Sequence, residues 1–146
     1  MKKLLAPLLF AVATAASAQP VSVHGAWARS TVTGQDSTGA YMTLTAREPL
    51  TFLGAQTPAA GIVEIHEMKM EGEVMKMRAA DTLPLAPGQP LRLAPGVYHL
   101  MMMDLKAPFK PGSHVPMTLR FRDAKGRESS LAVSVPVSVA PPPARP

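Results

Sequence analysis

Apolar and polar residues alternate along most of the chain in short runs, which is the spacing of β-strands and not of helices. Glycine, proline and aspartate residues separate the runs, as at 34–39, 86–88 and 123–126. The pattern predicts an all-β domain of about seven or eight mostly antiparallel strands, arranged as a β-sandwich or barrel. The alternating runs are residues 21–29, 39–46, 61–70, 73–79, 90–105, 115–121 and 130–139.

The two ends of the chain depart from this pattern. Lys2 and Lys3 precede an apolar stretch that ends in Ala16-Ser17-Ala18, which is the arrangement of a secretory signal peptide cleaved after Ala18. Residues 140–146, APPPARP, are expected to form a disordered tail because proline cannot donate to a sheet. We therefore expect an exported, folded domain over residues 19–139. No later apolar run reaches the roughly 18 residues needed to span a membrane.

Charge and composition exclude several classes of function. The formal charge is +5, and removing Lys2 and Lys3 leaves +3. These charges are scattered and not interleaved with aromatic residues, which argues against nucleic-acid binding. We find no Ser-His-Asp order, paired acidic motif or open zinc spacing, so an enzyme is not expected. The chain has no cysteine and therefore no thiolate ligand, but it has ten methionines.

Seven of these methionines lie between residues 68 and 103, together with two of the four histidines. The first group is EIHEMKMEGEVMKM, residues 64–77, which predicts a β-hairpin with Glu71-Gly72 as a two-residue loop. In that register His66 faces Met77 directly, and opposed side chains lie on the same face of the sheet. An odd-length loop would instead turn one strand's side chains to the other face.

The second group is GVYHLMMMD, residues 96–104. In an extended strand His99, Met101 and Met103 share one face, because side chains alternate. If this strand lies against the hairpin, His99 and Met101 complete a set of two imidazoles and two thioethers with His66 and Met77. Such neutral, soft ligands favour Cu(I), whereas zinc usually recruits cysteine or carboxylate.

The four residues have the spacing H-x10-M-x21-H-x-M, which resembles the signature of the periplasmic PCuAC-type copper chaperones. Residues 24–44 and 105–121 also resemble the opening and closing segments of that family, and the similarity covers most of residues 20–138. The resemblance implies a cupredoxin-like β-sandwich in the periplasm with Cu(I) ligands His66, Met77, His99 and Met101. It also implies copper delivery to a cytochrome oxidase subunit or its assembly factor. The tail of this chain lacks the histidines and methionines that extend some members.

The other methionines have two expected roles. Met42 and Met117 are expected in the core, since methionine fills irregular packing well. The remaining five are candidates for an auxiliary metal site or for an apolar rim that docks a partner: Met68, Met70, Met75, Met102 and Met103. Trp27 and Tyr41 are expected to anchor the core, and His24 and His114 to be ordinary surface or loop residues.

Two other functions stay open beside the copper carrier. A cupredoxin-like electron-transfer protein would need a cysteine thiolate with two histidines at a blue-copper site, and the chain has no cysteine. An assembly module without metal would leave both groups of histidine and methionine unexplained. The acceptor protein and the oligomeric state do not follow from the sequence.

Overall fold

A computed structural model of the chain describes residues 20–143. The predicted signal peptide, residues 1–18, and the end of the predicted tail, residues 144–146, lie outside this range. The described part contains ten strands and no helix long and apolar enough to cross a membrane. The strands are β1 (Val21–Arg29), β2 (Ser37–Ala46), β3 (Leu50–Gln56), β4 (Ala60–Glu71), β5 (Val74–Ala80), β6 (Leu83–Leu85), β7 (Leu91–Leu93), β8 (Tyr98–Leu105), β9 (His114–Asp123) and β10 (Glu128–Ser138).

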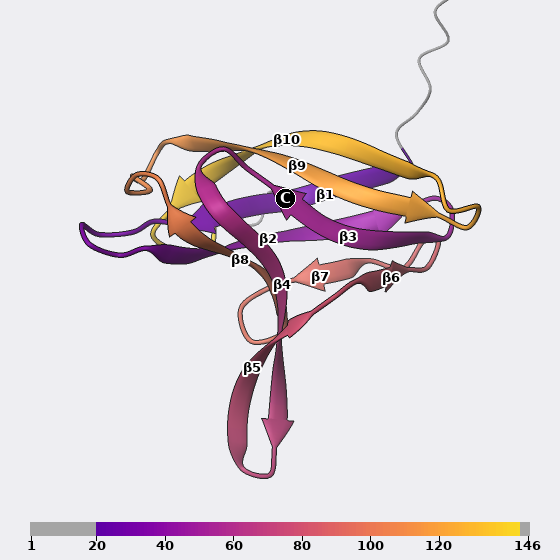
Figure 1. Cartoon of the computed structure of the whole chain (residues 1–146), viewed down its shortest axis with the longest axis horizontal. Helices are drawn as coiled ribbons and strands as arrows, with labels where there is room; N and C mark the ends of the chain where they lie inside the picture. Colours follow the sequence, from indigo (N-terminus) through magenta and orange to yellow (C-terminus); the bar gives the residue numbers. More distant parts are fainter. Residues whose placement is uncertain (1–19, 144–146) are drawn as a thin grey trace, which may run out of the picture.

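The strands form one continuous sheet that folds over into two layers (Figure 1). The strand order is β5-β4-β8-β7-β2-β1-β10-β9-β3-β6. Neighbouring strands are antiparallel except for β1 with β10 and β7 with β8. The expected all-β architecture with mostly antiparallel strands is therefore confirmed, although the structure has ten strands instead of seven or eight.

The additional strands are short or irregular. The run predicted over 90–105 is divided into β7 and β8 by a turn at Pro95-Gly96. Strand β3 carries a bulge at Gly54, where the φ angle is +119°, so its alternation is interrupted. Strand β6 has only three residues with Pro84 at its centre. A strand of three residues gives little periodicity in the sequence. Its proline is of the kind that is tolerated only at a sheet edge.

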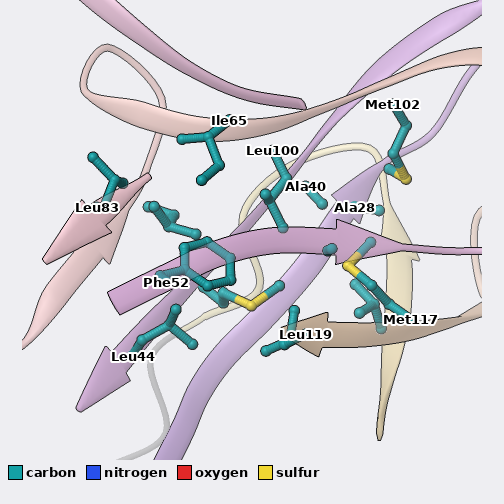
Figure 2. Close-up of a cluster of buried hydrophobic side chains, with 14 of the residues drawn as sticks. Ala28, Ala40, Leu44, Phe52, Ile65, Leu83, Leu100, Met102, Met117 and Leu119 are labelled. Carbon is teal, nitrogen blue, oxygen red and sulfur yellow. The ribbon is translucent and has the colours of Figure 1, made fainter. Parts of the chain in front are cut away.

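The core lies between the two layers. Apolar side chains from both layers meet there, and Phe52 and Phe121 pack with ring centroids 5.5 Å apart. Met42 and Met117 are buried in this core, as the sequence predicts. Figure 2 shows Ile65 of β4 together with Leu100 and Met102 of β8 in the same cluster. Because side chains alternate along a strand, the neighbours of these residues point to the outer face of the layer.

The hairpin of β4 and β5 projects away from the two layers (Figure 1). Its loop is Gly72-Glu73 and not the predicted Glu71-Gly72, since Glu71 pairs with Val74. Gly72 has a φ angle of +64°, which is the requirement for the first loop residue of a type II′ turn. The predicted pairing was therefore wrong: His66 faces Ala79, and Met77 faces Met68.

Moving the loop by one residue changes the opposed partners but preserves the faces. Each residue of β4 meets a partner that lies two positions further along β5 than predicted, and two positions is one full period of a strand. His66 and Met77 therefore still share one face of the hairpin, as diagonal instead of direct neighbours. Diagonal neighbours are about 7–8 Å apart, which long side chains can still bridge.

Candidate metal centre

Two histidines face each other at the root of the hairpin. Strands β4 and β8 are antiparallel neighbours, and their register places His66 directly opposite His99. The two imidazole ring centroids are 5.7 Å apart, with an angle of 56° between the ring planes. His99 is only 5% exposed, and the side chain of His66 is 14% exposed. The sequence predicted that both residues belong to one site, and the fold does bring them together.

One nitrogen of His66 has no partner. Its Nδ1 atom is buried and makes no hydrogen bond within residues 20–143. Its Nε2 atom lies 2.8 Å from Oε2 of Glu64. A neutral imidazole that donates its Nε2–H to this carboxylate leaves a lone pair on Nδ1. A buried nitrogen lone pair without a donor is unfavourable in an apoprotein, and it is what a metal ligand needs.

Glu64 is a candidate site residue that sequence reasoning missed. It lies two positions before His66 on β4, so both side chains are on the same face. Across the sheet Glu64 is opposite Met101. A carboxylate that accepts a hydrogen bond from a ligand histidine fixes the tautomer and orientation of the ring. The i, i+2 spacing of Glu64 and His66 in a predicted strand was the available signal.

His99 is held in its neutral form. Burial lowers the pKa of His99 below its ordinary value of 6.5, and the nearby His66 lowers it further. At neutral pH the ring therefore carries no positive charge that would repel a cation. Metal binding requires a deprotonated nitrogen, so this environment favours a ligand role.

Aromatic residues form the wall of the site beyond His99. The ring of Tyr41 on β2 lies 6.1 Å from that of His99, and Trp27 on β1 lies 4.8 Å from Tyr41. Both are buried, as expected, but neither belongs to the cluster between the layers. Gly39 pairs with Met101, and the hydroxyl of Tyr41 fills the space that a side chain at Gly39 would need.

The two predicted sulfur ligands approach from opposite sides. Met101 is half-buried on β8, two residue pairs along the ladder from the two histidines and therefore on the same face. Met77 is on β5 and 46% exposed, diagonal to His66. His66 on β4 lies on the diagonal between them, and its direct partner on β5 is Ala79, which has a short side chain. All four predicted ligands therefore lie on one face, with Met77 the most exposed.

The five auxiliary methionines do not stay together. Met68, Met70 and Met75 lie on the same hairpin face as Met77. Met103 is half-buried on the same face of β8 as Met101 and pairs with Ile62. Met102 is fully buried between the layers (Figure 2), so its expected place in an exposed rim is wrong. Its position between Met101 and Met103 in an extended strand sends it to the opposite face. His24 and His114 are exposed and are not part of the face that carries His66 and His99.

The comparisons with known proteins agree on the family and the fold. Residues 21–137 match the model of the LpqE-like family, described as "Putative lipoprotein LpqE-like". The chain is 33% identical over 121 residues to "Putative lipoprotein Lxx21020" of Leifsonia xyli subsp. xyli, covering 82% of this chain and 70% of that protein.

Two of the similar solved structures carry copper by their descriptions. The solution structure of Cu(I)-DR1885 from Deinococcus radiodurans is 34% identical, with a TM-score of 0.60, covering 86% of this chain and 83% of that one. The copper-bound PCuAC domain from PmoF2 is 20% identical, with a TM-score of 0.65, covering 84% and 95%. The second likeness shows the fold alone. The chain belongs to the LpqE-like family and has the cupredoxin-like β fold of the PCuAC domains.

Proposed function

We propose that this protein is a copper chaperone that binds Cu(I) through His66, Met77, His99 and Met101. The observation that carries the proposal is the directly opposed histidine pair, in which one buried nitrogen has no hydrogen-bond partner among residues 20–143. Two neutral imidazoles and two thioethers form a soft donor set with no formal charge, which suits Cu(I) better than Mg²⁺, Ca²⁺ or Zn²⁺. The 34% identical protein described as Cu(I)-DR1885 supports the choice of metal.

The arrangement also suits a carrier that must release its cargo. His66, His99 and Met101 lie near the body of the protein, whereas Met77 is on the projecting hairpin. An exposed thioether is a ligand that an acceptor can replace first, because no other packing holds it. Copper then passes to the acceptor through a shared set of ligands without being released into water. The acceptor we propose is a metalloprotein such as a cytochrome oxidase subunit or its assembly factor.

We further propose that the protein acts in the periplasm. Residues 1–18 have the pattern of a signal peptide. The family model and the relative from Leifsonia xyli are both described as lipoproteins, which supports an exported protein. Cell fractionation, with determination of the amino-terminal residue of the recovered protein, tests this location and the predicted cleavage after Ala18.

Direct transfer of copper is the experiment that tests the function. The protein is loaded with Cu(I) under anaerobic conditions and mixed with an apo copper-accepting domain of cytochrome oxidase, and the copper in each protein is measured after separation. We expect copper to move to the acceptor at a rate that depends on acceptor concentration. A rate equal to the spontaneous release rate, independent of acceptor, would contradict a chaperone. A His99→Gln variant that loads no copper is the control for the donor site.

A further inference from the structure

The outer half of the β4–β5 hairpin carries methionines that the proposed site does not use. Met70 of β4 pairs directly with Met75 of β5, and the next pair toward the body that shares their face is Met68 with Met77. Met70 is 55% exposed and Met75 is 47% exposed. This part of the hairpin projects from the two layers (Figure 1). It therefore presents thioethers to solvent at successive positions along one face.

Packing does not account for these side chains. The methionines that fill the core are Met42, Met102 and Met117, and all three are buried. The other face of the hairpin is an ordinary solvated surface with ion pairs, among them Arg78 with Glu67 and Lys76 with Glu71. The thioether face thus covers no core, although half-exposed apolar side chains grouped on one surface usually have a binding role.

We propose that Met68, Met70 and Met75 form a second Cu(I) site, weaker than the first. Opposed residues of a hairpin have Cβ atoms about 5 Å apart, and Met70 and Met75 hold that relation. Met68 is on the same face, two residues before Met70. Each side chain is unbranched with three rotatable bonds, so three sulfurs can converge on one ion. Thioether is among the soft ligands that select Cu(I).

The position of this second site explains its use and its weakness. Its Met70–Met75 pair lies nearer the hairpin loop than Met68, which pairs with Met77, the residue we assign to the first site. Cu(I) arriving at the hairpin tip would therefore meet thioethers before it meets the histidines, and Cu(I) leaving by the tip would meet them last. Three flexible side chains, of which Met70 and Met75 are exposed and Met68 is half-buried, lose conformational freedom when they bind, so the affinity is lower than at the imidazoles. The inference rests on the proposed function for its choice of Cu(I), but it uses none of the histidines.

The two sites differ in their response to protons, which makes the test specific. Thioethers need no deprotonation, whereas an imidazole nitrogen must be free of its proton to bind the metal. Cu(I) is titrated anaerobically into the protein against a chromogenic Cu(I) chelator at neutral pH and at about pH 4.5. The lower pH is well below the pKa of free imidazole. We expect two equivalents at neutral pH, one of them weaker, and only the weaker one at the acidic pH.

Two double variants assign the equivalents. Met70→Leu with Met75→Leu keeps the apolar surface and removes two sulfurs; it should retain the tight equivalent and weaken the other by at least about tenfold at both pH values. His66→Gln with His99→Gln should lose the tight equivalent and keep the weaker one. The inference is overturned if the methionine variant binds two equivalents with the affinities of the wild type, or if the wild type binds only one, which would leave the hairpin as an apolar docking face. Failure of the proposed function would give a different result: the histidine variant would bind Cu(I) with the same affinities as the wild type.

Discussion

His66 and His99 occupy directly opposed positions on β4 and β8, and their imidazole centroids are 5.7 Å apart. The two rings are not hydrogen-bonded to each other in the described part of the chain. Nε2 of His66 is instead hydrogen-bonded to the carboxylate of Glu64. The pair therefore presents nitrogen donors at the junction between the body of the protein and the hairpin. The first four predictions test the consequences of this arrangement.

The first prediction concerns metal selectivity. The protein should bind Cu(I) far more tightly than Zn²⁺, because its soft neutral donors include two thioethers and the chain supplies no cysteine. Competition between the two metals, measured with a chelator specific to each, gives both affinities. Similar affinities for Zn²⁺ and Cu(I) would show that the thioethers are not ligands.

The second prediction separates binding from folding at Met77. Replacing Met77 by Leu keeps the apolar volume, so the free energy of unfolding should fall by less than about 1.5 kcal/mol. Affinity at the tight Cu(I) site should fall by much more than that, because one of four ligands is lost. Met70→Leu is the matched control, since Met70 lies on the same hairpin face but farther from His66. Tight binding lost in Met70→Leu and kept in Met77→Leu would move the site to the hairpin tip.

The third prediction assigns a positioning role to Glu64. Glu64→Ala removes the carboxylate that accepts from Nε2 of His66, and Cu(I) affinity should fall by about 10–100-fold. Glu64→Gln retains an acceptor oxygen and should lose less. Glu67→Ala is the control, because Glu67 is on the same strand but its carboxylate pairs with Arg78 on the other face. Equal losses in the Glu64→Ala and Glu67→Ala variants would indicate a general effect of charge and not of His66 orientation.

The fourth prediction concerns the stability of the apoprotein at different pH values. The pKa of His99 in the folded state is below its ordinary value of 6.5, because burial disfavours the charged ring. The unfolded chain therefore binds the proton first, and the free energy of unfolding should decrease as pH falls below about 6.5. Urea unfolding of the wild type and of His99→Gln between neutral and mildly acidic pH measures the effect. The same pH dependence in both proteins would assign it to another group.

How much the sequence could predict is clearest at the hairpin. The strand period placed His66 with Met77 on one face of the hairpin and, separately, His99 with Met101 on one face of the later strand. The first of these survives the error in the loop, because the error moved each pairing by a full period. The exact register depended on whether Gly72 is the first or the second residue of the loop. Gly72 is the first and has a positive φ angle, which belongs to a turn type that the sequence alone left open.

Other features depend on contacts between distant strands. The pairing of β4 with β8, which sets His66 opposite His99, joins segments about thirty residues apart and has no local signal. The position of Tyr41 beside His99 likewise has no local signal. Alternation would place Tyr41 in a strand, but it would not place it beside His99. Met102 could have been predicted correctly, since strict alternation in β8 already separates it from Met101 and Met103.

X-ray absorption at the copper edge tests the central claim most directly, because it counts the atoms bound to the metal. The protein is loaded with slightly less than one equivalent of Cu(I), so that the tighter site is filled first. The account predicts two nitrogen and two sulfur neighbours, with the outer scattering of imidazole rings, and the loss of one sulfur in Met77→Leu. A copper ion surrounded only by sulfur, without imidazole scattering, would contradict the assignment of His66 and His99.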